Sequence, residues 1–192
     1  EAIKVGEGMG HGVEMGPVIS AKAKNRIVGL IDDAQERGSK VVLDGRGLTV
    51  PGYENGHFLG PTILDDVPLD APVYTEEVFG PVLAIVHADT YEEALKIVND
   101  QPFGNGSAIF TNDGGVARRF TLDVEAGLGG GNVPIPTPVA FYSFGGWKES
   151  LLGDTHIHGP EGVTFYTRAK AITERWPTEK TYAATMSFQR DE

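Results

Sequence analysis

Cysteine is absent from this sequence of 192 residues, and its absence excludes several kinds of chemistry at once. A chain without thiols cannot form disulfides, thiolate zinc sites or a cysteine nucleophile from its own residues. The lack of disulfides also agrees with a reducing compartment. We therefore expect a cytoplasmic location, with the mitochondrial matrix as the alternative.

Basic residues are scarce as well, because 16 lysines and arginines stand against 27 aspartates and glutamates, for a net charge of −11. Such a surface repels phosphate backbones and anionic lipids, so we expect no nucleic-acid partner and no membrane partner. No apolar run approaches the roughly 20 residues that span a bilayer. Hydrophobic residues still make up 40% of the chain, enough to bury a core without disulfides.

Several catalytic motifs are missing, among them the serine elbow GxSxG, the zinc motif HExxH and the phosphate-binding P-loop. Residues 6–10 (GEGMG) do not form a dinucleotide fingerprint, because a long loop and a proline separate them from the next helix. Residues 127–132 (GLGGGN) do not form a dinucleotide fingerprint either, because they lead into prolines.

His156 and His158 share one face of an extended segment, but two imidazoles make no closed metal site. We expect an exposed polar edge there.

Three segments combine an N-cap residue with apolar side chains that recur every three or four positions, so they are predicted helices. They are 21–37 after Ser20, 91–99 after Thr90, and the segment from Asn112 or Asp113 to about 124. Gly38 is a plausible stop for the first helix. Thr90 and Glu93 form a capping box at the start of the second.

Short apolar runs alternate with these helices and are predicted strands. They are 41–43, 62–64, 81–87, 106–111 and 127–133, with a long alternating run at 163–175. Strand and helix alternation predicts an α/β fold with parallel strand pairs. The glycines at 129–131 weaken one strand. A linker is expected near 150–160, and the polar tail begins at Thr178.

Residues 76–82 (EEVFGPV) carry the clearest candidate site. Two acids precede a buried strand at the mouth of a sheet, where α/β proteins bind ligands and a carboxylate can accept hydrogen bonds from a ribose diol. The alternative is that both glutamates are solvated loop charges. Residues 142–147 are aromatic and glycine-rich, and they form either the lining of an apolar pocket or a packed turn.

Four segments, taken in order, resemble the aldehyde dehydrogenase superfamily, and the resemblance covers roughly residues 1–177. They are 15–20 (MGPVIS, with VG at 5–6), 76–82 (EEVFGPV), 104–111 (GNGSAIFT) and 144–150 (FGGWKES). A narrower resemblance, to the CoA-acylating methylmalonate-semialdehyde dehydrogenase branch, rests on further segments. They are 132–136 (NVPIP), 144–148, 159–160 (GP) and 165–168 (FYTR), with Leu151 where most relatives have glycine.

The resemblance implies a three-layer αβα catalytic domain with a mostly parallel sheet, of which residues 1–155 are a part. It implies an oligomerisation segment at 156–177, whose strand joins the sheet of a neighbouring subunit, and a polar tail at 178–192. The enzyme would be a homo-oligomer, either a dimer or a tetramer.

Three side chains take roles from the same resemblance. Glu77 matches the glutamate that binds the nicotinamide ribose hydroxyls of NAD, and Phe79 matches the aromatic beside the nicotinamide. Phe144 matches an aromatic that lines the substrate tunnel. The implied reaction oxidises a small-molecule aldehyde, malonate or methylmalonate semialdehyde, with NAD and CoA, to an acyl-CoA with loss of carbon dioxide.

The family's nucleophilic cysteine, general-base glutamate and nucleotide-binding domain would precede Glu1 in the intact enzyme. We therefore expect no catalytic residue in this chain, no resident metal, and no activity from the chain alone. Three alternatives stay open: a non-catalytic interaction module of the same origin, an aldehyde dehydrogenase that makes a free acid, and a hydrolase that uses the 142–147 pocket. No serine or metal spacing suggests the last.

Overall fold

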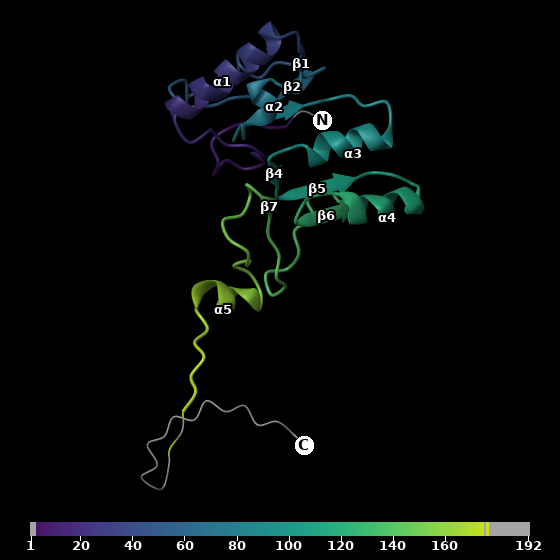
Figure 1. Ribbon diagram of the computed structural model, residues 1–192. Coiled ribbons are helices and arrows are strands. Elements are labelled where there is room, and N and C mark those ends of the chain that lie inside the picture. The colour runs from purple at the N-terminus through teal and green to yellow at the C-terminus, as the bar shows by residue number, and fades with distance from the viewer. Residues whose placement is uncertain (1–2, 175, 177–192) are drawn as a thin grey trace.

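The structure is a computed structural model that describes residues 3–174 and residue 176. The helices are α1 (Ala21–Glu36), α2 (Pro72–Thr75), α3 (Tyr91–Asn99), α4 (Gly114–Asp123) and α5 (Glu161–Tyr166). The strands are β1 (Lys40–Leu43), β2 (Thr62–Asp65), β3 (Val82–Ala84), β4 (Phe103–Gly104), β5 (Gly106–Ile109), β6 (Leu128–Gly131) and β7 (Trp147–Lys148). Figure 1 shows α1 and α2 beside β1 to β3, and α4 beside β5 and β6.

The three predicted helices are confirmed because their start signals are local. Ser20 Oγ accepts a hydrogen bond of 3.1 Å from Ala23 N, which caps α1. Thr90 Oγ1 accepts from Glu93 N at 3.1 Å and caps α3. The Asp113 carboxylate caps α4 by accepting from two backbone N–H groups. The sequence patterns do not predict the short elements α2, β4 and β7.

The largest hydrophobic core lies between α1 and the first three strands. Its buried members are nine side chains that are mostly aliphatic: Ile27, Leu30, Ile31, Ala34, Leu59, Leu64, Val67, Ala71 and Val73. The four from α1 are the apolar stripe that the helical spacing predicts. The core therefore fixes α1 relative to the strand β3, which the candidate site at 76–82 enters.

The strands form three small sheets with mixed pairing. β5 pairs with β6 in parallel across α4, as the βαβ interpretation predicts. β2 also pairs with β3 in parallel, whereas β3 does not pair with β5 among the described strands, although α3 lies between them. β1 pairs with β2 antiparallel, because no helix carries the chain back between them. β4 and β7 are also antiparallel. The α/β class is confirmed, whereas a single three-layer, mostly parallel sheet stays a prediction for a longer protein.

A close backbone approach accounts for one of the three glycines at 129–131. A Cβ on Gly130 would lie 2.8 Å from the Val133 carbonyl oxygen and 3.3 Å from Ala108 Cβ on the paired strand. Gly129 and Gly131 have open space at the same position, and nothing in the structure explains them.

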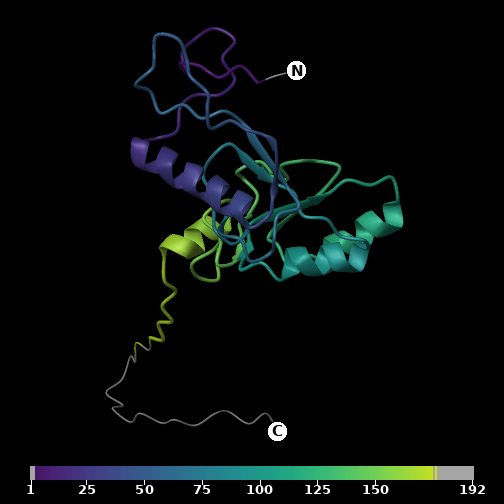
Figure 2. The same ribbon diagram turned by 90° about the horizontal axis from the view of Figure 1, so that it is seen from above.

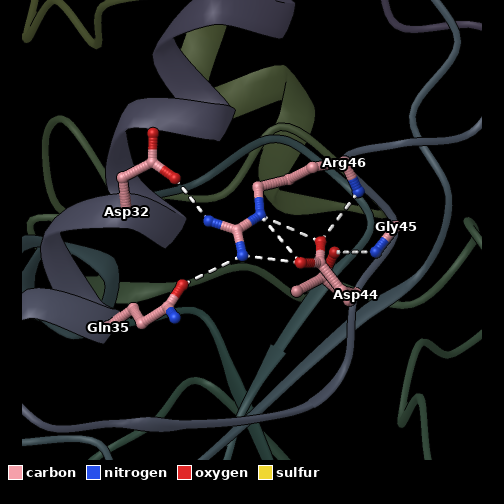
Figure 3. Close-up of polar contacts among 6 residues, drawn as sticks. Asp32, Gln35, Asp44, Gly45 and Arg46 are labelled. Atoms are coloured by element: carbon pink, nitrogen blue, oxygen red, sulfur yellow. Dashed lines mark hydrogen bonds and ion pairs between the residues drawn. The ribbon is translucent and has the colours of Figure 1, made fainter.

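Arg46 holds the loop that follows β1 against α1 (Figure 3). Its guanidinium donates to the Asp44 carboxylate at 2.6–3.1 Å, to Gln35 Oε1 at 2.9 Å and to Asp32 Oδ1. The hydrogen bonds from Arg46 lower the pKa of Asp44 from 3.8 to about 2. The loop over 44–61 is therefore tied to the first helix by charged contacts as well as by the core.

The prediction of a long strand over 163–175 is wrong for its first residues, which are helical. Val163 lies in α5, and residues 167–174 pair with no strand among the described residues. Pro160 already has helical backbone angles, and Glu161 lies in the first turn, so a local helix start outweighs the alternating pattern. Residues 167–174 run away from the body of the molecule (Figure 1). The predicted tail at 178–192 lies outside the described residues.

Figure 2 shows α1 on one side of the strands and α3 with α4 on the other. Helices α3 and α4 are in contact, since Arg119 Nη2 lies 3.3 Å from Glu92 Oε1. The Arg119 guanidinium also lies over the Tyr91 ring, 4.8 Å from its centroid. Within residues 3–174 and 176, no helix combines the length and the apolar character needed to cross a bilayer.

Candidate functional site

The loop that follows α2 and enters β3 carries the predicted residues Glu77 and Phe79. Arg26 of α1 lies under this loop and donates to three of its oxygens. The acceptors are Val78 O at 2.9 Å, Glu77 O at 2.9 Å and Glu76 Oε2 at 3.1 Å. The loop is therefore held on the helix by side-chain contacts that the sequence patterns do not predict.

The two adjacent glutamates have different surroundings. The Glu76 carboxylate forms an ion pair with Arg26. The Glu77 side chain is exposed, and its carboxylate has no hydrogen bond and no ion pair within the part of the chain that the structure describes. Both side chains are exposed, as the interpretation of solvated loop charges predicts, and they differ in that only Glu76 forms an ion pair among the described residues. Glu77 keeps its acceptor capacity for a molecule outside this chain.

The backbone at Phe79 and Gly80 is specialised. Phe79 has φ of 50°, in the left-handed region that bulky residues rarely adopt, and its ring is 82% exposed. A Cβ on Gly80 would lie 2.6 Å from Ile27 Cδ1, a buried core atom of α1. Glycine at this position therefore lets the loop approach the helix closely, and the approach leaves the Phe79 ring facing outward.

A cavity of about 580 Å³ lies between this loop, α1 and the segment 15–19. Its walls are mainly apolar and include Val18, Ile27, Phe79 and Pro81, with Arg26 as the charged member. Phe79 lines this cavity, whereas Glu77 does not. A flat ring could pack on this wall, while the Glu77 carboxylate faces solvent beside it.

Phe144 lies in a second cavity of about 450 Å³. Its ring stacks on His158, with ring centroids 4.5 Å apart and planes 7° apart. Gly145 and Gly146 line the same cavity. The middle of the 142–147 segment therefore lines a cavity, as one of its two interpretations predicts, and the substrate role of Phe144 stays a prediction. Tyr142 and Trp147 are exposed and do not line that cavity.

The prediction of an exposed polar edge at His156 and His158 is wrong, because both side chains are partly buried and engaged. His156 Nδ1 lies 3.1 Å from Glu161 Oε2, while His158 stacks on Phe144. Sequence reasoning predicted neither contact, because the His158 ring meets Phe144 of a distant loop position and the His156 ring meets Glu161 of the first turn of α5. Neither imidazole belongs to a metal-type cluster among the described residues.

A group with the side chains of a metal site occurs elsewhere, at Asp65, Asp66 and His87. His87 Nε2 lies 2.6 Å from Asp65 Oδ1, and this hydrogen bond lowers the pKa of Asp65. Lys40 Nζ lies 2.5 Å from Asp66 Oδ2, and that contact raises the pKa of Lys40. The Lys40 ammonium group pairs with Asp66 and the His87 ring with Asp65, so the cluster is a largely exposed group of polar pairs.

Lys148 has a structural role that sequence reasoning missed, although it lies within the 144–150 motif. Its ammonium group donates to Gln101 O at 3.1 Å and to Asn99 O, and pairs with Glu125 Oε2 at 3.0 Å. These contacts join β7 to the ends of α3 and α4. Among the described hydrogen bonds, Ser143 and Ser150 accept from backbone N–H groups and neither contacts a histidine, which gives the hydrolase interpretation no support.

Comparison with known proteins gives consistent matches. The sequence model described as "Aldehyde dehydrogenase family" matches residues 1–172. A malonate-semialdehyde dehydrogenase of Pseudomonas aeruginosa is 50% identical over 184 residues, which are 96% of this chain and 37% of that protein. A mitochondrial, acylating methylmalonate-semialdehyde/malonate-semialdehyde dehydrogenase of Bos taurus is 47% identical over 177 residues, which are 92% of this chain and 33% of that protein.

A solved structure agrees with these relatives. It is that of a Sinorhizobium meliloti protein assigned as a methylmalonate-semialdehyde dehydrogenase, in complex with NAD. The TM-score is 0.86 at 47% identity, and the match covers 93% of this chain and 36% of that one. The chain thus spans about a third of the length of these proteins.

Proposed function

The chain belongs to the aldehyde dehydrogenase family, and we propose that it supplies the C-terminal part of an NAD-dependent, CoA-acylating methylmalonate- or malonate-semialdehyde dehydrogenase. The names of its relatives support these substrates, and one of them is named acylating. In the complete enzyme the semialdehyde would be oxidised to an acyl-CoA with loss of carbon dioxide. Because this chain has no cysteine, the thiol nucleophile would come from the rest of the enzyme.

The observation that carries the proposal is the state of Glu77. Its carboxylate is exposed and has no partner in the described part of the chain, although it lies one residue from a glutamate that Arg26 neutralises. A carboxylate in this state can accept hydrogen bonds from two ribose hydroxyls without breaking any contact of its own. This free acceptor therefore fits the two hydroxyl donors of the nicotinamide ribose of NAD.

The two aromatic residues take complementary roles in this proposal. Phe79 would pack beside the nicotinamide ring, and its exposed side chain on an apolar wall suits that contact. Phe144 would line the path of the semialdehyde, in the second cavity. When bound, NAD would supply the hydride acceptor for the oxidation. The side chains of this chain bind and orient the reactants and transfer no proton.

Glu77→Ala in the complete enzyme tests the proposal directly. Loss of a charged acceptor should weaken NAD binding by about 1.5–3 kcal/mol, since hydrogen bonds to charged groups contribute that much. Isothermal titration gives the NAD affinity, and stopped-flow absorbance gives the burst of NADH formation. An unchanged affinity together with an unchanged burst rate would refute the role of Glu77. The matched control is Glu36→Ala, which removes a different exposed glutamate, at the end of α1 and outside the 76–80 loop.

The proposal also includes a homo-oligomer, a dimer or a tetramer, joined through the segment 156–177. Large apolar side chains are exposed along this segment, among them Val163, Tyr166 and Ile172. Several large apolar side chains exposed on one segment favour an interface, since exposed apolar patches mark such sites. For the complete enzyme we propose a reducing compartment, the cytoplasm or the mitochondrial matrix, since the Bos taurus relative is named mitochondrial.

A further inference from the structure

Arg26 makes more contacts with the 76–80 loop than a simple ion pair requires. Nη1 donates to Val78 O, and Nη2 donates both to Glu77 O and to the Glu76 carboxylate. Two of the three acceptors are therefore consecutive backbone carbonyls. A guanidinium has donors on a rigid planar fork and can hold both at once, which a lysine ammonium on a flexible stem would not do as well.

These contacts fix the backbone immediately before a strained residue. Phe79 has φ of 50°, a conformation that persists in a bulky residue only where the surroundings hold it. Arg26 fixes the peptide groups of Glu77 and Val78 on one side, and the tight contact of Gly80 with Ile27 restrains the other. The orientation of those peptide groups decides where the Glu77 carboxylate and the Phe79 ring point.

We propose that Arg26 is a positioning residue for binding of the nicotinamide nucleotide. It holds the loop so that the Glu77 carboxylate stays free and directed outward, while it takes up the neighbouring Glu76 carboxylate itself. The inference rests on the proposed NAD role of Glu77. The competing explanation is that Arg26 only fastens the loop to α1, with no consequence for the ligand.

A double-mutant cycle in the complete enzyme separates the two explanations. The variants are Arg26→Met, Glu77→Ala and the double substitution, and the measured quantity is the Kd of NAD. Arg26→Met alone should raise this Kd roughly tenfold, because the loss of charged hydrogen bonds lets the carboxylate leave its place. In the Glu77→Ala background the same change should raise the Kd no more than about twofold, since Arg26 acts through Glu77.

Equal losses of NAD affinity in both backgrounds would overturn the inference, because a general structural role does not depend on Glu77. The inference would also be overturned if the Kd of NAD were unchanged in Arg26→Met but raised in Glu77→Ala. Arg37→Met is the matched control, since Arg37 ends the same helix and pairs with Asp33 and Asp70 away from the loop. That control should leave the Kd of NAD unchanged.

Amide hydrogen exchange of residues 76–80, measured without NAD, keeps this inference distinguishable from the proposed function. Exchange should be faster in Arg26→Met and unchanged in Arg37→Met. Unchanged exchange in Arg26→Met overturns the positioning role while the NAD role of Glu77 can still stand. Faster exchange combined with an unaltered Kd in Glu77→Ala refutes the NAD role, and the inference falls with it.

Discussion

The first and last thirds of the chain differ in how they bury apolar side chains. The first contains α1 and most of the core, and Ile31 and Leu64 there are fully buried. Beyond Val124, no large hydrophobic side chain of the described residues is buried, and Leu152 is 91% exposed. The first region folds on a core of its own, whereas the last presents apolar surface that other protein would cover.

This difference explains where the two candidate sites lie. Glu77 and Phe79 are carried by a loop that is anchored on the core helix through Arg26 and Gly80. Phe144 lies in the open second cavity, whose wall includes Phe165 of α5. The 76–80 loop is therefore fixed by contacts within the chain itself, while the cavity of Phe144 lies in the region whose large apolar side chains are exposed. Four experiments can break or sharpen that contrast.

The largest effect should come from deleting residues 163–177 in the complete enzyme. If the exposed apolar surface of the last region is an assembly surface, its removal should convert the oligomer to a smaller species. Sedimentation velocity would detect that change. An assembly of unaltered size would break the comparison, because the exposed side chains would then need another explanation. Deletion of the tail from residue 178 onward is the control.

Truncation of a core side chain should have the next largest effect. Ile31→Ala should lower the free energy of unfolding by about 2–5 kcal/mol, since it opens a cavity in a packed core. Leu152→Ala, at an exposed site of the last region, should change it by less than about 0.5 kcal/mol. Urea denaturation of the 192-residue chain measures both. A cost for Leu152→Ala close to that of Ile31→Ala would show that the last region is packed after all.

Gly80→Ala tests the close contact between the core helix α1 and the 76–80 loop. The added Cβ would lie 2.6 Å from Ile27 Cδ1, so the loop or the core must shift. We expect a loss of about 1–3 kcal/mol in the free energy of unfolding, the usual cost of overpacking, and weaker NAD binding in the complete enzyme. Gly47→Ala, where a Cβ meets open space, is the control. Full NAD affinity in Gly80→Ala would show that the loop tolerates displacement.

The smallest effect concerns the pH dependence of the charged contact at Asp44. The pKa of Asp44 in the folded chain is lowered from 3.8 to about 2 by hydrogen bonds from Arg46, so its contribution is fully present above the unfolded pKa. That contribution is lost as the pH falls through the folded value. The carboxylate is about half exposed, so Asp44→Asn should cost less than about 1 kcal/mol at neutral pH.

Urea denaturation of the wild-type chain and of Asp44→Asn over a series of pH values would measure this contribution. The gap between their free energies of unfolding should narrow as the pH falls from 3.8 toward 2. A gap that widens in acid would contradict the assignment to Asp44. Asp154→Asn, at an exposed carboxylate, should show no such trend.

The sequence by itself determined the three capped helices and the parallel pairing of β5 with β6. It also determined the family, through motifs whose order along the chain carries the resemblance. Caps such as Ser20 and Thr90 act within one turn, and apolar periodicity needs no distant partner. These features can therefore be predicted from neighbouring residues alone.

Only the tertiary structure decided what depends on distant partners. It distinguished Glu76 from Glu77 through Arg26, which lies about fifty positions away along the chain. It left residues 167–174 of the predicted strand at 163–175 without a paired strand in the described part of the chain, and a strand needs such a partner for its backbone hydrogen bonds. Two adjacent glutamates are alike in sequence, and they differ only once another element approaches one of them.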